Sequence, residues 1–189
     1  MIQAKQLLIF LGFTLSAMTG FPQGKNAEFR RNPGAPRFHE DSAGGVSVDD
    51  PMLRVTDFGA VGDGVTLNTT AIQKALDSGS AVGGTVVVPK GDFLSGPLPL
   101  PGNTTLELQQ GAVLRLRNDI ADYPVSGSGY LNFITATKVS HIRITGDGTI
   151  DGQGAPWWQA YDAGGLSHRR PQLIYIDQCS DVMISGIHT

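Results

Sequence analysis

A segment of eight residues occurs twice toward the C-terminal end of the chain. The stretch "VSHIRITG" (Val139 to Gly146) aligns without a gap with "CSDVMISG" (Cys179 to Gly186), at a constant offset of 40 residues. In both copies a serine, an aliphatic-x-Ile pair, a hydroxyl residue and a glycine occupy the same positions. "NTTLELQQGAVL", from Asn103 onward, fits this pattern more loosely. Units repeated at intervals of a few tens of residues are typical of solenoids, in which each unit stacks on the one before it.

The same part of the chain consists of β-rich runs separated by Gly, Asn, Asp or Pro. They are "GGTVVVPKG", "TTLELQQGAVLRL", "FITATKVSHIRITGDGTI" and "QLIYIDQCSDVMISGIHT". Apolar residues alternate within them, as in Ile142/Ile144 and Val182/Ile184, which indicates strands with one buried face. Because no helices alternate with these strands, a βαβ sheet is disfavoured. We therefore expect an all-β fold, a parallel β-helix; a β-sandwich is the alternative.

One helix is predicted ahead of the strands. An apolar stripe at helical spacing is formed by Ala71, Ile72, Ala75 and Leu76. Thr70 and Gln73 have the spacing of a capping box, and Ser78-Gly79 predicts the end of the helix. Such a helix can cover the open strand edges and the apolar core at the start of a stack of coils. We interpret it as a cap without a chemical role.

The N-terminal residues predict export. Lys5 precedes the apolar run Leu7 to Leu15, and the small residues of "SAMTG" follow. This pattern is typical of a secretory signal peptide, here residues 1–20, and predicts a secreted or periplasmic protein. Residues 21–51 lack an apolar period and are interpreted as a linker. The domain proper is expected to span residues 52–189.

The net charge and the hydropathy bear on the expected partners, and the cysteine count bears on the expected disulfide bonds. The net charge is −3, whereas a nucleic-acid-binding protein normally has a strongly basic face. Beyond the predicted signal peptide no segment is long and apolar enough to cross a membrane, so neither nucleic acid nor membrane is an expected partner. Cys179 is the single cysteine, which excludes an internal disulfide framework. We expect it to be a buried small side chain in a strand rather than a nucleophile.

Several stretches resemble a known family. "VTDFGAVGDGVTLNTTAIQKALD" (Val55 to Asp77) resembles the entry segment of pectate-lyase-like β-helix proteins. The later stretches "GGTVVVPKGDFLSGPLPLPGNTTLELQQGAVL", "GDGTIDGQGAPWW" and "RRPQLIYIDQCSDVMISGI" together resemble glycoside hydrolase family 28, the polygalacturonases and their relatives. This resemblance implies a right-handed parallel β-helix with an N-terminal capping α-helix. It also implies an enzyme without a cofactor, monomeric when full length, that hydrolyses a pectic polysaccharide with inversion.

The catalytic motifs of that family do not occur in this chain. Family members carry aspartates in Asn-Thr-Asp and Asp-Asp motifs, a histidine in Gly-His-Gly and a basic residue in Arg-Ile-Lys. Here Asn68 begins Asn-Thr-Thr, His188 lies in Gly-Ile-His-Thr, and the single Asp-Asp pair is Asp49-Asp50 in the linker. We expect that pair to be solvated, the chain to be an N-terminal fragment that stops before the catalytic coils, and no catalytic residue among its 189 residues. Two alternatives are a pectate lyase, which would need calcium, and a non-catalytic glycan-binding β-helix.

Basic and aromatic residues supply the candidate binding site. His168, Arg169 and Arg170 are consecutive in "SHRRPQ" and are predicted to bind substrate, because arginine pairs well with uronate carboxylates. A solvated loop is the alternative for this segment. Trp157 and Trp158 can stack on sugar rings, but packing against a coil is the favoured interpretation.

The stretch "GDGTIDGQGAPWW" could also suggest a calcium-binding loop or a phosphate-binding loop. In an EF-type loop that begins at Asp147, the twelfth position must be a bidentate glutamate, and it is Trp158. A phosphate loop would need a helix start after the glycines, and none is expected. The sequence therefore predicts a turn between strands, with no metal and no cofactor.

Overall fold

The computed structural model describes residues 38–40, 46–48 and 50–189. The predicted signal peptide, residues 1–20, lies outside the described residues, as does most of the predicted linker. Within that linker, β1 (Phe38–Glu40) and β2 (Val46–Val48) pair as an antiparallel hairpin. Asp50 is exposed, whereas its neighbour Asp49 is not among the described residues.

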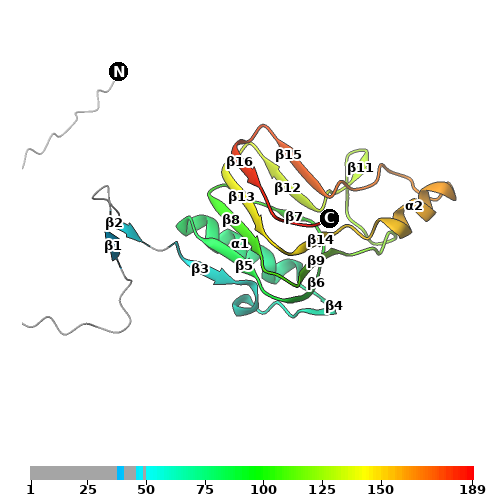
Figure 1. Ribbon diagram of the computed structural model, residues 1–189. Coiled ribbons are helices and arrows are strands. Elements are labelled where there is room, and N and C mark those ends of the chain that lie inside the picture. Colours follow the sequence, from blue (N-terminus) through cyan, green and yellow to red (C-terminus); the bar gives the residue numbers. More distant parts are fainter. Residues whose placement is uncertain (1–37, 41–45, 49) are drawn as a thin grey trace, which may run out of the picture. The chain divides into compact units, whose positions relative to one another are not determined.

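Residues 52–189 form a parallel β-helix, in which three parallel sheets run along a stack of coils (Figure 1). The first sheet contains β3 (Met52–Arg54), β5 (Thr85–Val88), β8 (Thr104–Leu108), β13 (Ser140–Gly146) and β16 (Ser180–Ile184). The second contains β4 (Asp63–Leu67), β6 (Gly91–Ser95), β9 (Ala112–Leu116) and β14 (Thr149–Asp151). The third contains β7 (Leu98–Pro99), β12 (Ile134–Thr137) and β15 (Ile174–Asp177). The prediction of an all-β parallel β-helix is confirmed.

The pairing register follows the sequence repeat. In β13 and β16, Ser140 pairs with Ser180 and Ile144 with Ile184, which is the predicted offset of 40 residues. The third sheet keeps the same offset between β12 and β15. Each coil therefore places aliphatic side chains directly over those of the coil before it.

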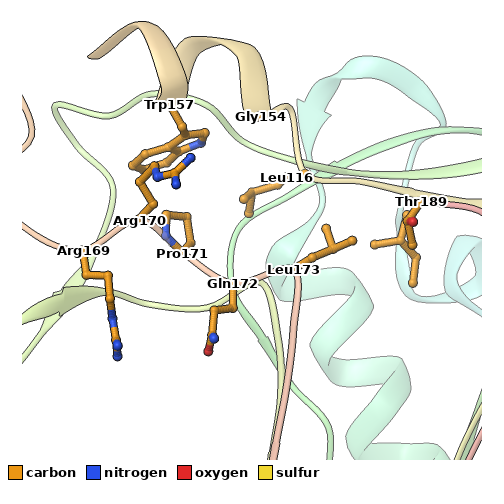
Figure 2. Close-up of a pocket in the computed structure, with 11 residues that line it drawn as sticks. Leu116, Gly154, Trp157, Arg169, Arg170, Pro171, Gln172, Leu173 and Thr189 are labelled. Carbon is orange, nitrogen blue, oxygen red and sulfur yellow. The ribbon is translucent and has the colours of Figure 1, made fainter. Parts of the chain in front are cut away.

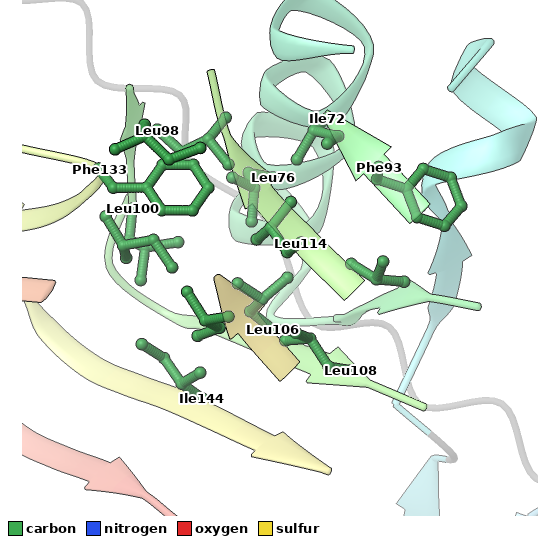
Figure 3. Close-up of a cluster of buried hydrophobic side chains, with 14 of the residues drawn as sticks. Ile72, Leu76, Phe93, Leu98, Leu100, Leu106, Leu108, Leu114, Phe133 and Ile144 are labelled. Carbon is green, nitrogen blue, oxygen red and sulfur yellow. The ribbon is translucent and has the colours of Figure 1, made fainter. Parts of the chain in front are cut away.

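The interior of the coils is filled by these stacked aliphatic residues (Figure 3). Leu106 lies in register with both Val86 and Ile144, and all three side chains are fully buried. Phe93 and Leu114 are paired in the same way in the second sheet. Fully burying one such side chain is worth roughly 1.5–3 kcal/mol, so this column of side chains is the main stabilising feature of the coils.

The repeated glycines mark a close approach between successive coils. Gly146 and Gly186 both have positive φ, at 114° and 75°. A Cβ atom on Gly146 would overlap the carbonyl oxygen of Leu108, and one on Gly186 would overlap the carbonyl oxygen of Gly146. Any side chain at either position would force two coils apart, which is the physical reason for the glycine in the repeat.

Helix α1 (Thr69–Val82) covers the start of the core, as predicted for a capping helix. Figure 3 shows its Ile72 and Leu76 directed toward the leucines of the strands. The predicted end at Ser78-Gly79 is wrong, because α1 continues to Val82 and ends at Gly83 in the left-handed conformation. Gly79 lies inside the helix, where a Cβ atom would approach Val86 Cγ2 to 2.6 Å, so this glycine permits close packing on β5.

The predicted capping box is also wrong. The residue before α1 is Asn68, and Thr70 and Gln73 lie within the helix. Asn68 forms no capping hydrogen bond. Its side chain instead accepts from the backbone N–H of Val61 and donates to the carbonyl oxygens of Val61 and Thr66. These bonds hold the loop that follows the short 3-10 helix η1 (Val55–Phe58) against the start of α1.

The stretch "GDGTIDGQGAPWW" contains more than the predicted turn. Gly146 ends β13 and Thr149 begins β14, as expected, but α2 (Gly154–Asp162) then follows. The expectation that no helix starts after the glycines is therefore wrong. The sequence pattern did not indicate α2, because Pro156 and two adjacent tryptophans do not form an apolar stripe at helical spacing. A helix N-terminus alone does not make a binding site, and no cluster of metal-binding side chains occurs among residues 50–189.

Cys179 lies between β15 and β16 rather than in a strand, and is half-buried. Its Sγ donates a weak hydrogen bond of 3.3 Å to the carbonyl oxygen of Asp177.

Neither helix in the described part of the chain has the length and hydropathy of a membrane-spanning segment.

Candidate functional site

A polar pocket opens on the outer side of the third sheet, beside a small antiparallel hairpin. The hairpin consists of β10 (Val125–Ser126) and β11 (Gly129–Tyr130). The pocket has a volume of about 470 Å³, within the range of small-ligand sites. Its lining includes hydroxyl, amide, aromatic and guanidinium groups, among them Ser128, Asn132, Thr135, Arg169, Gln172 and Tyr175. No carboxylate lines it.

Arg169 is fixed by its backbone. Its N–H donates to the carbonyl oxygen of Ser128 at 3.3 Å, and its own carbonyl oxygen accepts from the N–H of Tyr130 at 3.0 Å. A parallel bridge to Gly129 completes the link to the hairpin. The side chain is exposed, and none of the described carboxylates lies within ion-pairing distance of it. The backbone of Arg169 is therefore fixed, and its guanidinium has no partner among the described carboxylates.

Arg170 is held differently, by the two exposed aromatic residues of α2. Its Cζ lies 3.6 Å from the centroid of the Trp158 ring and 5.3 Å from that of Tyr161. Contacts of this kind are worth about 0.5–1 kcal/mol at exposed sites. Arg170 thus fastens α2 to the segment that leads into β15, and its cation faces the aromatic rings.

His168 belongs to an aromatic cluster. Its ring packs edge-on against Tyr130 at 5.5 Å between centroids, and its Nδ1 lies 2.8 Å from Ser167 Oγ. The half-buried histidine supports the hairpin rather than facing the polar pocket, which it does not line.

The two adjacent tryptophans have opposite environments. Trp157 is 3% exposed and packs edge-to-face against Tyr123 and Tyr130, so the packing interpretation is confirmed for this residue. Burial raises the pKa of the Tyr123 hydroxyl well above its usual range. Trp158 is 53% exposed, and its ring packs against the guanidinium of Arg170.

A second, more apolar pocket of about 430 Å³ lies between α2 and the last described coil (Figure 2). Leu116, Trp157 and Leu173 contribute to it, and Arg169 and Arg170 line it as well. Figure 2 shows Arg169 and Gln172 extending to the same side, away from Trp157. Both pockets are lined by Arg169, Arg170 and Gln172.

These arrangements offer a cation, amides and hydroxyl groups to an anionic, hydroxylated ligand. Glycoside hydrolysis needs two carboxyl groups on either side of the scissile bond, and no carboxylate lines either pocket. Asp177 and Asp181 lie at the edges of the strand ladders. The carboxylate of Asp181 pairs with His141 Nδ1 at 2.6 Å and that of Asp177 with the Gln178 amide at 3.5 Å.

The structure thus places the three predicted residues in three different environments. His168 supports the hairpin, Arg170 stacks on α2, and Arg169 alone presents an uncommitted cation beside the polar pocket. Sequence analysis missed Asn132, Gln172 and Tyr175. The repeat could have found them, because the offset of 40 that relates the strands also relates Asn132 to Gln172 and Thr135 to Tyr175.

Comparison with known proteins agrees with this architecture. A Vitis vinifera protein named "Probable polygalacturonase" is 39% identical over an alignment of 160 residues, covering 75% of this chain and 33% of that protein. The Exo-poly-alpha-D-galacturonosidase of Dickeya chrysanthemi is 39% identical over 153 residues, covering 72% of this chain and 25% of that protein. The family 28 exopolygalacturonase structure from Yersinia enterocolitica matches with a TM-score of 0.63 at 26% identity, covering 77% of this chain and 38% of that one.

The chain spans a quarter to a third of the length of these two curated relatives. The sequence profile described as "Glycosyl hydrolases family 28" matches residues 79–189, which is more than half of the chain. On this match, and on its likeness to the two galacturonidases, the chain belongs to family 28 of the glycosyl hydrolases.

Proposed function

We propose that the protein of which this chain forms all or part is a pectin-degrading glycoside hydrolase of the polygalacturonase type. The observation that carries this proposal is the family match over residues 79–189, together with 39% identity to proteins named for galacturonide hydrolysis. In this chemistry one carboxylic acid protonates the leaving oxygen while a carboxylate on the other side of the sugar activates water, which inverts the anomeric carbon. The described residues supply coils and a binding surface for that reaction, and its carboxylates are expected in a later part of the protein.

We further propose the following organisation. Residues 1–20 are a signal peptide that directs the protein out of the cytoplasm, residues 21–51 are a linker, and residues 52–189 are the first coils of the catalytic domain. The export proposal is tested by N-terminal sequencing of the protein recovered outside the cytoplasm. Its first residue is expected close to position 21, and a mature protein that retains residues 1–20 contradicts the assignment.

The activity is tested on polygalacturonate with the whole protein. We expect release of reducing ends, with the inverted anomer appearing first in proton NMR spectra of the fresh product. Unsaturated, ultraviolet-absorbing ends would identify a lyase instead, and polymer binding without cleavage would identify a glycan-binding protein. The 189-residue chain prepared alone is expected to release no reducing ends, and release by this chain would refute the assignment of the carboxylates to a later part of the protein.

Within this function, we assign the basic segment 168–170 to substrate binding, with unequal roles. Arg169 is the residue proposed to contact a galacturonate carboxylate, because its guanidinium has no partner among the described carboxylates and lines the polar pocket. Arg170 and His168 shape the site through Trp158 and Tyr130. Replacement of Arg170 is therefore expected to act through the position of α2.

A further inference from the structure

The hairpin that forms one wall of the polar pocket has little buried surface of its own. It belongs to residues 117–132, which leave the stack of coils between β9 and β12. Within this range only Tyr123 and Tyr130 are buried, and they lie at the two bases of the hairpin β10–β11. At the tip, a Cβ atom on Gly127 would meet nothing within 4 Å. The side-chain attachment of this wall therefore depends on the two tyrosines.

Both tyrosines pack against one side chain of the next coil, Trp157 on α2. The ring centroids of Tyr123 and Tyr130 lie 5.2 and 5.0 Å from the centroid of Trp157, and 5.9 Å from each other. All three contacts are edge-to-face, a geometry that is favourable beyond the area that it buries. The two backbone hydrogen bonds between Arg169 and the hairpin add to this attachment. We refer to Tyr123, Tyr130 and Trp157 as the aromatic latch.

The aromatic latch also contains two buried hydrogen-bond donors. The Tyr123 hydroxyl and the Trp157 indole N–H have no hydrogen-bond partner among the described residues, although these two residues are only 4% and 3% exposed. Burial raises the pKa of the Tyr123 hydroxyl, as expected for a group removed from water. A donor that loses water without gaining a partner destabilises the closed hairpin, and it is hydrated again when the hairpin opens.

We propose that the hairpin β10–β11 is a displaceable wall of the polar pocket, which the aromatic latch holds weakly because it buries two unpaired donors. Opening withdraws Tyr123 and Tyr130 from Trp157 and breaks the two bonds to Arg169, while the strands of the coils stay paired. The hairpin residues Ser126 and Ser128 line the pocket, so their displacement widens it. This movement rests on the described residues alone. Its use in admitting a wider polymer rests on the proposed function.

Amide hydrogen exchange in the whole protein measures the opening. The N–H groups of Tyr130 and Arg169 form the two bonds that opening breaks, so their exchange reports the population of the open form. Tyr123→Phe keeps the ring and removes one unpaired donor. We expect this variant to slow exchange of both N–H groups at least about fivefold, because burying an unsatisfied polar group is costly. The N–H groups of β13 should exchange as in the parent protein.

Two further variants separate the effect of the hydroxyl from that of the ring. Tyr161→Phe, at a tyrosine of α2 that is 59% exposed, is the matched control and should leave the exchange of both N–H groups unchanged. Tyr123→Leu also lacks the hydroxyl but loses two edge-to-face contacts, so exchange should be at least about fivefold faster than in Tyr123→Phe.

Three results of the exchange measurement overturn the proposal. Faster exchange in Tyr123→Phe than in the parent protein would show that the hydroxyl has a stabilising partner. Unchanged exchange would show that the buried hydroxyl does not weaken the aromatic latch. Exchange of the Tyr130 and Arg169 N–H groups in the parent protein that is as slow as in β13 would show that the hairpin opens only when the coils unfold.

The second test uses hydrolysis to measure whether opening widens the pocket. Tyr123→Phe should keep the parent KM for unbranched polygalacturonate. For a galacturonan that carries sugar side chains, KM should rise by the factor by which exchange slows, because a ligand that binds only the open form loses affinity with the population of that form. Equal KM changes for the two polymers overturn the assignment of the hairpin as a displaceable wall and leave the proposed function intact. Slowed exchange in a protein that hydrolyses neither polymer refutes the proposed function and supports the movement.

Discussion

At the scale of single residues, Asn68 shows how one buried amide holds the entry to the solenoid. The residue is 2% exposed, and its side chain makes three hydrogen bonds to the backbone of Val61 and Thr66. Asn68→Ala leaves these backbone groups without partners and should lower the free energy of unfolding by about 2–3 kcal/mol, at about 1 kcal/mol for each bond. Denaturant unfolding measures the loss. Asn118→Ala, at an exposed asparagine, is the control and should change stability by less than about 0.5 kcal/mol.

A second prediction at this scale concerns Asp63 and pH. Hydrogen bonds from the Thr66 hydroxyl and from the backbone N–H groups of Thr66 and Val65 lower the pKa of Asp63 to about 2. A carboxyl group whose pKa is lower in the folded state stabilises that state above its unfolded value of 3.8, and the contribution disappears as the pH falls toward the folded value. The stability difference between the parent protein and Asp63→Asn should therefore be constant above about pH 5 and shrink toward pH 2.

Unfolding free energies measured across this pH range test the Asp63 prediction. A difference for Asp63→Asn that does not vary with pH contradicts the hydrogen-bonded turn. In that case a group other than Asp63 would account for the loss of stability at low pH.

At the scale of elements, the strands could be predicted from the sequence and the helix boundaries could not. The last two coils obey a repeat of 40 residues, because β15 and β16 must place their aliphatic residues over those of the coil below, as Ile184 does over Ile144. The glycine at position 146 is part of the same repeat, because two coils approach so closely at its Cα that no side chain fits. The helices have no such partner in the repeat. The continuation of α1 through Gly79 accompanies its close packing on Val86, and α2 accompanies the burial of Trp157 among tyrosines. Both are tertiary contacts that no local pattern contains.

The Gly79 contact gives a prediction at this scale. In an isolated helix Gly79→Ala would be stabilising by about 1 kcal/mol, but here the added methyl group meets Val86 Cγ2 at 2.6 Å, tighter than a real contact. Overpacking of this kind typically costs about 1–3 kcal/mol, so we expect net destabilisation. In the Val86→Ala background the same substitution should cost less, which a double-mutant cycle measures as coupling. A stabilised Gly79→Ala protein would show that α1 can move away from β5.

At the scale of the whole described domain, the family could be predicted from motifs, whereas the binding surface could not. The stretches that identify the family, such as "GDGTIDGQG", form corners and strands of the coils, so they report the architecture. The polar pocket instead combines a hairpin, two strands and the pair Arg169 and Arg170, which meet only because successive coils stack in register. Two of the three basic residues turned out to be committed to aromatic partners. Their assignment required the positions of Tyr130 and Trp158 in space.

The final prediction concerns the behaviour of the 189-residue chain prepared alone. Strand β16 is the last strand of the first sheet, so one of its edges has no strand partner among the described residues. Val182 and Ile184 are 38% and 43% exposed, although the residues paired with them, Ile142 and Ile144, are fully buried. An unpaired strand edge beside exposed aliphatic side chains is a surface on which another chain can pair.

Sedimentation velocity should therefore show larger species as concentration rises, and Val182→Lys/Ile184→Lys should return the chain toward a monomer. Val82→Lys, at an aliphatic residue of helix α1 that is 56% exposed, is the control and should leave the association unchanged. A chain that sediments as a single monomer at every concentration would contradict the prediction, and would mean that the exposed edge of β16 is too twisted or too short to pair.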